Sequence, residues 1–122
     1  MRRFLVTALA LLAAGCGGRS TDYWLQQLKD QDVVKRRQAV RELGSRTAEA
    51  PRVVPALAES LRDDNEYVRH DCATALGKFG PEARAAAPAL LAALKDRDHN
   101  VRRAAEMALK KITPDGAGKG ER

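Results

Sequence analysis

The chain has 122 residues, of which 44% are hydrophobic and 31% charged, and its formal net charge of +6 is too small to indicate a nucleic-acid-binding surface. Aromatic residues make up only 4%, whereas alanine and leucine are abundant, and this composition favours helices over strands. We therefore expect one small all-α domain that binds no nucleic acid.

The first fifteen residues have the organisation of a secretory signal peptide. Arg2 and Arg3 precede an apolar run from Phe4 to Ala14 that a single threonine interrupts. This run is too short to cross a bilayer, because a stable transmembrane helix needs about 20 residues. A short cationic start, a short apolar segment and small residues at its end are the parts of a signal peptide, so we expect residues 1–15 to be removed.

The apolar run ends in "LAAGC", which resembles the lipobox of bacterial lipoproteins. In that family a peptidase cuts before the cysteine, and the thiol receives a diacylglycerol with fatty acyl chains such as palmitate. The resemblance implies lipidation of Cys16, a short linker over residues 16–20 and a stable membrane anchor, since several acyl chains hold a protein where one is marginal. The segment departs from the pattern at Ala13, where the family commonly has leucine. The alternative is an ordinary signal peptide cut near Gly15, which gives a periplasmic or secreted protein.

The rest of the chain contains three copies of a repeat at an offset of 33 residues. "LRDDNEYVRHDCATALGKFG" from Leu61 aligns with "LKDRDHNVRRAAEMALKKI" from Leu94, and "LKDQDVVKRRQAVRELG" from Leu28 is the first copy. Every copy has an aspartate followed six positions later by an arginine. The first copy departs from the others at Lys35, where they have valine.

Each copy predicts two helices separated by a polar break. Pro55 and Pro88 are expected near the first turn of the first helix of their copies, where a missing N–H costs nothing. Aspartate or asparagine in the break would cap the second helix, in which apolar residues recur at helical spacing. The expected helices span residues 21–29, 33–45, 51–62, 66–79, 82–95 and 98–112. The expected repeats are about 21–46, 51–80 and 82–112, followed by a disordered Gly-rich tail over 113–122.

This repeat resembles the short HEAT-like type named after phycobilisome lyases. The resemblance implies a right-handed α-solenoid of about three helical hairpins over residues 21–112, in which each repeat packs on the next. In that family, aspartate and arginine at the recurring positions form a structural ladder between repeats, and an anionic ligand held by the arginines is the alternative. The expected ladder residues are Asp30, Arg36, Asp63, Arg69, Asp96 and Arg102.

In HEAT arrays the second helices line the concave face, and the residue after each ladder arginine would lie there. These residues are Arg37, His70 and Arg103. We expect a basic face that binds another protein, through an acidic surface or an extended peptide, and a solvated face without a ligand is the alternative. The candidate partner-binding residues are Arg37, Arg41, Tyr67, His70, Thr74, Arg103, Met107 and Lys110.

Two further positions have a structural interpretation. Trp24 aligns with Leu57 and Leu90, so we expect it in the core, and the alternative is that Tyr23 and Trp24 contact lipid headgroups beside the anchor. Cys72 aligns with alanine in the neighbouring copies, which predicts a small buried hydrophobe.

The sequence contains no pattern that indicates catalysis or a metal site. The histidines His70 and His99 do not recur in phase, and the His-Glu dipeptides that hold iron in HEAT-type hydroxylases are absent. We expect no cofactor and a non-enzymatic protein-binding or scaffolding module, anchored at the bacterial cell envelope. The alternatives are an accessory or chaperone-like subunit of an envelope enzyme, a cryptic HEAT-type metal enzyme, and self-association through the repeat ends. The last of these would use Ala104, Ala105, Met107 and Ala108.

Overall fold

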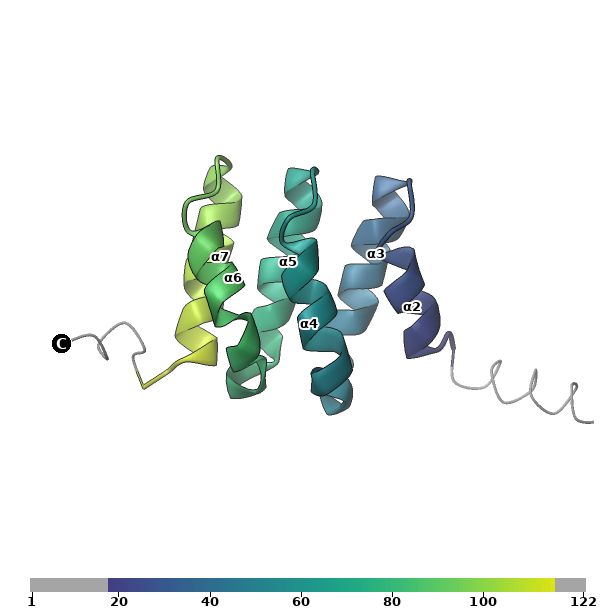
Figure 1. Cartoon of the computed structure of the whole chain (residues 1–122), viewed down its shortest axis with the longest axis horizontal. Helices are drawn as coiled ribbons and strands as arrows, with labels where there is room; N and C mark the ends of the chain where they lie inside the picture. Colours follow the sequence, from purple (N-terminus) through teal and green to yellow (C-terminus); the bar gives the residue numbers. More distant parts are fainter. Residues whose placement is uncertain (1–17, 116–122) are drawn as a thin grey trace, which may run out of the picture.

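Three helical hairpins stand side by side in the computed structural model, which describes residues 18–115 (Figure 1). The first helices of the hairpins are α2 (Thr21–Gln27), α4 (Ala50–Ser60) and α6 (Ala87–Ala93), and the second helices are α3 (Val33–Gly44), α5 (Glu66–Lys78) and α7 (His99–Ile112). Residues 18–115 contain no β-strand, and the predicted all-α solenoid is confirmed. The expected signal peptide, Cys16 and residues 116–122 of the expected tail lie outside the described residues.

The second helices begin at the caps that the polar breaks predict. Asp32 accepts a hydrogen bond from the N–H of Val34, and Asp98 accepts one from the N–H of Val101. Asn65 has the same role at the start of α5. Each cap satisfies backbone donors that have no partner inside the helix, which fixes where the second helix of a hairpin starts.

The first helix of the third hairpin is shorter than predicted. The sequence favours one helix over 82–95, but Gly80–Ala86 forms a 3₁₀ segment, η2, with a kink at Ala83. The α-helix α6 begins only at Ala87, so that Pro88 lies in its first turn as expected. A proline at this place needs no N–H, and its fixed φ angle suits the start of a helix.

Pro55 lies one turn further into its helix than the first turn, so the prediction that its missing N–H costs nothing is wrong. A short 3₁₀ segment, η1 (Thr47–Glu49), leads into α4, which begins at Ala50 with Pro51 in its first turn. Pro55 is therefore inside α4, where it has no N–H to donate to the carbonyl of Pro51 one turn earlier. The sequence contains two prolines four residues apart, and the first of them marks the helix start.

The core is a continuous row of apolar side chains between the helices. Trp24 is 8% exposed, and its ring packs edge-to-face against Tyr23 with centroids 4.9 Å apart, so its predicted core position is confirmed. Cys72 is fully buried, as predicted, and burial raises the pKa of its thiol well above the ordinary value. The largest fully buried side chains are Leu43, Leu57, Leu76, Leu90 and Ile112.

The array is tighter on the side of the second helices. The helix α5 packs extensively on both α3 and α7, whereas α4 touches α6 at only a few residues. Glycines allow this closeness: a Cβ on Gly44 would lie 2.9 Å from the Cβ of Ala75, and one on Gly77 would lie 3.3 Å from the Cα of Ala108. The surface of α3, α5 and α7, called here the second-helix face, is thus the inner side of the array.

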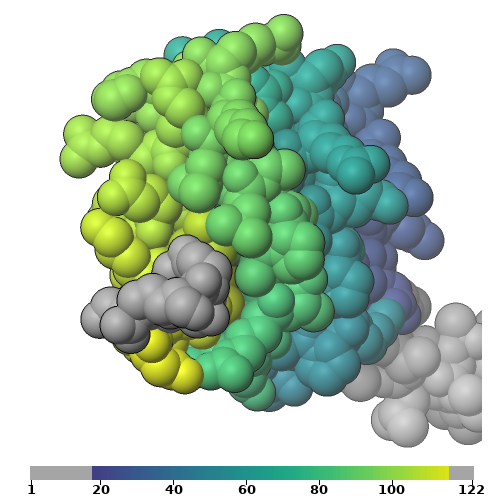
Figure 2. All heavy atoms as spheres, turned by 60° about the vertical axis from the view of Figure 1, so that its left-hand side comes forward, coloured from purple at the N-terminus to yellow at the C-terminus, as the bar shows by residue number. Residues whose placement is uncertain are grey.

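The end of the array at α7 is polar where the inner repeats are apolar. Val40 and Ala73 are fully buried between repeats, and the residue 33 positions further on is the exposed Glu106. Lys110 stands at the repeat position that is Gly44 in the first repeat and Gly77 in the second. Its ammonium forms an ion pair with Glu106 at 3.2 Å. Figure 2 turns this end forward, with α6 and α7 in front.

The residues expected to mediate self-association through this end do not lie on it. Ala104, Ala105 and Ala108 are 8% exposed or less, because they pack inward from α7. Met107 is exposed, but it lies on the second-helix face. A contact between copies through these alanines is therefore excluded by their burial.

Candidate functional site

Ion pairs between aspartate and arginine join successive repeats. Arg36 donates through Nε and Nη2 to the carboxylate of Asp63, at 2.9 and 3.2 Å. Arg69 donates in the same way to Asp96, also at 2.9 and 3.2 Å. These are two-point bonds between a planar guanidinium and a carboxylate, and they fix orientation as well as distance.

The same arginines also bind the backbone of their own repeat. Arg36 Nη1 donates to the carbonyl of Asp30, Arg69 Nη1 to that of Asp63, and Arg102 Nη1 to that of Asp96. Within residues 18–115 the donors of Arg102 reach only backbone carbonyls. The guanidinium donors of Arg36 and Arg69 thus bind the protein itself, which is the geometry of a structural ladder.

Asp96 shows the electrostatic consequence of this ladder. Burial raises the pKa of its carboxyl, but the hydrogen bond from Arg69 and the bond from the N–H of Asp98 lower it by more. The net effect is a pKa below the ordinary value of an aspartate. Asp96 therefore stays ionised in the folded protein at neutral pH.

A second charge cluster lies where α3 meets α5. Arg37 Nε donates to Asp71 Oδ2 at 2.8 Å, and Arg41 Nη1 lies 3.7 Å from the same oxygen. The hydrogen bond to Asp71 raises the pKa of Arg37, whose guanidinium also lies over the ring of Tyr67 at 5.3 Å. Two of the predicted partner-binding arginines thus already have a carboxylate partner in the chain.

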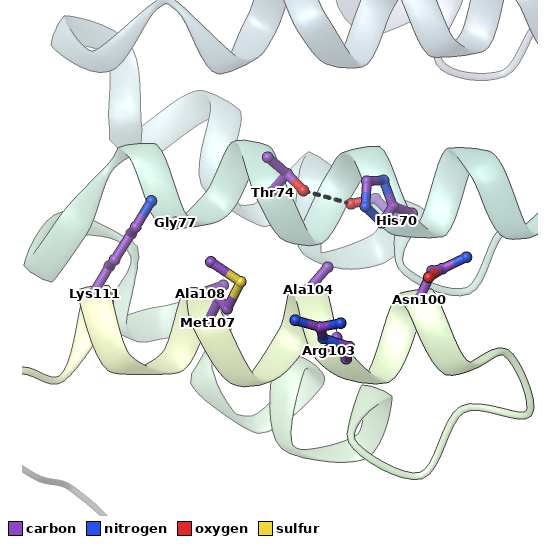
Figure 3. Close-up of a pocket in the computed structure, with 9 residues that line it drawn as sticks. All are labelled: His70, Thr74, Gly77, Asn100, Arg103, Ala104, Met107, Ala108 and Lys111. Atoms are coloured by element: carbon purple, nitrogen blue, oxygen red, sulfur yellow. Dashed lines mark hydrogen bonds between the residues drawn. The ribbon is translucent and has the colours of Figure 1, made fainter.

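A groove of about 230 Å³ runs along the second-helix face between α5 and α7 (Figure 3). We call it the α5–α7 groove. Small residues form its floor, and polar or long side chains from both helices form its walls. The floor residues are Gly77, Ala104 and Ala108, and the wall residues are His70, Thr74, Asn100, Arg103, Met107 and Lys111.

The groove brings together half of the predicted partner-binding residues. His70, Thr74, Arg103 and Met107 line it. Arg37 and Tyr67 line a neighbouring hollow with His70, and Arg41 lies beside Asp71. Lys110 is outside the groove and is paired with Glu106.

Two wall residues of the groove, Asn100 and Lys111, were not among the predicted partner-binding residues. Their signal is the helical period, because a stripe at positions 100, 103, 104, 107, 108 and 111 covers one face of α7. Arg103 and Lys111 form no ion pair with any residue of the described part of the chain, 18–115. Among the described residues, the groove therefore has two cations without an ion-pair partner, above a small, apolar floor.

Neither a metal site nor a membrane span is found in residues 18–115. No group of three or more histidine, cysteine, aspartate or glutamate side chains there is arranged to hold a metal ion. No helix of the same segment has the length and apolarity that a bilayer crossing requires.

Stacked helical hairpins joined by an aspartate–arginine ladder define an α-solenoid repeat protein. A family model described as HEAT repeats matches residues 21–114, and the chain belongs to the HEAT-repeat family. The predicted relation to this family is thereby confirmed, whereas the lipoprotein leader stays a prediction.

Among solved structures, the chain is similar to one described as the complex of CpcE and CpcF of phycocyanin lyase from Nostoc sp. PCC7120. The two share 29% sequence identity with a TM-score of 0.70, over 79% of this chain. The match spans 38% of the length of that chain. No curated protein matches the sequence. Since the similar structure is a lyase, membership of the fold does not by itself exclude a part in an enzyme.

Proposed function

We propose that this protein is a non-enzymatic protein-binding or scaffolding module whose second-helix face engages a partner protein. The observation that carries the proposal is the α5–α7 groove, where Arg103 and Lys111 have no carboxylate partner within residues 18–115. Repeat arrays present extended surfaces of this kind to partners. The similar solved structure is itself a complex of two proteins, which supports the same role.

Site-specific photo-cross-linking tests this function. A photoreactive residue at Met107 probes the groove, and one at Glu59, exposed on α4, probes a first helix. We expect a discrete cross-linked partner, identified by mass spectrometry, from position 107 and none from position 59. Arg103→Glu should abolish the cross-link from position 107 without lowering the free energy of unfolding. Equal cross-linking from both positions, or none, would contradict the proposal.

We also propose that Cys16 anchors the module to a membrane of a bacterial cell envelope. The support is the leader sequence alone: a cationic start, a short apolar run and small residues before the cysteine. The test is the intact mass of the protein extracted from membranes, compared with a Cys16→Ser variant. A chain that starts at Cys16 and carries the mass of acyl chains, lost in the variant, is the expected result. A soluble product without lipid would assign the protein to the periplasm or the medium.

A role as an accessory or chaperone-like subunit of an envelope enzyme is the second candidate, favoured by the similarity to a lyase complex. It is distinguished by the cross-linked partner, which would be an enzyme that loses activity when this chain is removed. A cryptic metal enzyme is tested separately by metal analysis of the purified chain. Stoichiometric iron or zinc that is lost in His70→Ala would overturn the non-enzymatic proposal.

A further inference from the structure

The junction of α3 and α5 holds a carboxylate of the chain itself on the second-helix face. Asp71 accepts a hydrogen bond from Arg37 at 2.8 Å, and its carboxylate lies 3.7 Å from Arg41 and 3.3 Å from Nδ1 of His70. The Asp71 side chain is only 13% exposed. This junction therefore shows how basic groups on adjacent second helices enclose one carboxylate.

The next junction also has basic side chains, but it has alanine at the place of Asp71. Ala104 stands 33 residues after Asp71, at the equivalent place in the repeat, and it forms part of the floor of the α5–α7 groove. Arg103 follows His70 by the same offset, and Lys111 follows Lys78. In Figure 3 Arg103 lies beside Ala104, and Lys111 lies further along α7, beyond Met107 and Ala108. The groups around Asp71 map only partly onto the second junction, because Arg37 and Arg41 correspond to His70 and Thr74, whereas His70 corresponds to Arg103. Lys111 is a cation with no counterpart among the groups around Asp71, and Ala104 stands in place of the carboxylate.

We propose that the α5–α7 groove binds an aspartate or glutamate side chain of an extended partner segment, whose carboxylate takes the place above Ala104 that Asp71 has at the preceding junction. The inference rests on the proposed function, because it names the chemistry that the second-helix face recognises. A carboxylate between Arg103 and Lys111 gains charge-assisted hydrogen bonds from groups that have no ion-pair partner within residues 18–115.

The shape of the groove fits an extended segment. The stripe from Asn100 to Lys111 covers about 16 Å along α7, which is the length of about five residues of extended chain. The floor of glycine and alanine lets a backbone approach closely. Thr74 and Asn100 offer hydrogen-bonding groups along the walls, and the exposed Met107 is an adaptable apolar contact beside them.

The first test is an NMR titration of the ¹⁵N-labelled full chain with two peptide pools. Both pools contain five-residue amidated peptides that are random except at the centre, which is glutamate in one pool and glutamine in the other. We expect saturable shifts of the amides of Gly77, Ala104 and Ala108 with the glutamate pool, and binding about tenfold weaker with the glutamine pool. Equal effects of both pools, or no shift at millimolar peptide, would overturn the inference. The same shifts with inorganic phosphate or phosphatidylglycerol vesicles would also overturn it.

Substitutions in the groove give the matched controls. Arg103→Gln and Lys111→Gln should each weaken binding of the glutamate pool about tenfold, whereas Lys110→Gln, on the same helix but outside the groove, should not. Ala104→Asp supplies the missing carboxylate from the chain itself and should block the peptide while the circular dichroism spectrum stays unchanged. Binding that survives Ala104→Asp in the folded protein would contradict the proposed place of the carboxylate.

The reverse substitution removes the carboxylate from the junction of α3 and α5. Asp71→Ala frees Arg37 and Arg41, so the number of glutamate-pool sites should rise from one to two, and Arg37→Gln should remove the second site again. Asp71→Asn, which keeps the shape of the side chain, gives the same comparison if the alanine variant does not fold. A single site in both folded variants would contradict the inference.

The outcomes separate this inference from the proposed function. If position 107 still cross-links a partner in the Ala104→Asp variant, the face binds a protein without using a carboxylate, and only the inference fails. If position 107 captures no partner in the unchanged chain, the proposed function fails as well.

Discussion

Arg69 is a buried charged residue, and its side chain is only 7% exposed beside Asp96. Replacing it by methionine keeps much of the volume but leaves the Asp96 carboxylate without its partner across the repeat interface. Breaking a buried ion pair from one side costs about 3 kcal/mol, so we expect Arg69→Met to lower the free energy of unfolding by that amount. Arg102→Met should cost about 1 kcal/mol, because within residues 18–115 Arg102 binds only carbonyls. Urea unfolding measures both losses, and equal losses would show that the ion pair contributes nothing.

The lowered pKa of Asp96 predicts how this pair responds to acid. A carboxyl whose pKa is lower in the folded than in the unfolded chain stabilises the fold at a pH above the unfolded value, about 3.9. That stability is lost as the pH falls through the folded-state value. The free energy of unfolding should therefore decrease between pH 5 and pH 3 in the unchanged protein, with a smaller decrease in Arg69→Met. Parallel pH profiles for the two proteins would refute the assignment to Asp96.

Among the helices, the contact of α3 with α5 depends on Gly44. A Cβ at this position would lie 2.9 Å from the Cβ of Ala75, closer than two such atoms pack, so Gly44→Ala must move α5 or bend α3. The crowding costs about 1–3 kcal/mol, and the better helix propensity of alanine returns about 1 kcal/mol. We expect a net loss of about 1 kcal/mol in thermal or urea unfolding. Gly77→Ala, where the nearest atom is 3.3 Å away, is the matched comparison and should lose less.

The elements differ in how far their sequence determines them. The second helices follow from an aspartate or asparagine cap and a helical apolar period, both of which are local signals, and the helix starts agree with the structure. The first helices depend on proline position, and proline does not distinguish a first turn from an interior one, as Pro55 shows. Helix propensity does not predict the kink at Ala83, because alanine favours a helix.

The same distinction applies to the candidate site. The repeat offset places Arg37, His70 and Arg103 in one column, and all three lie on the second-helix face. The repeat offset does not predict that Arg37 binds Asp71. Asp71 lies 34 residues away in the sequence and contacts Arg37 only when α3 and α5 pack. Lys111 lines the groove because helical spacing places it on the same face of α7 as Arg103 and Met107, whereas Lys110 lies outside that face.

For the whole molecule, the polar residues at the ends of the array decide whether copies stack on one another. At the first end, Lys35 and Glu42 stand where the second repeat has the buried Val68 and Ala75. At the last end, the ion pair of Glu106 and Lys110 stands where the inner repeats have small or apolar residues. Terminal repeats of this kind keep an array soluble, because their outer faces need no further repeat to cover them.

Removing the polar residues of the last end should therefore create an association surface. In a Glu106→Ala, Lys110→Ala variant, apolar residues surround the half-buried Leu109 on the outer side of α7. Copies of the chain can bury this apolar surface only against each other. We expect the sedimentation coefficient of the variant to rise with protein concentration, while that of the unchanged chain and of a Glu59→Ala control stays constant. Concentration-dependent association of the unchanged chain to the same extent would mean that the ion pair does not protect this end. A sedimentation coefficient of the double variant that does not change with concentration would mean that polar residues on α7 are not what prevents stacking. The stacking of repeats would then require the close glycine contacts as well as an apolar face.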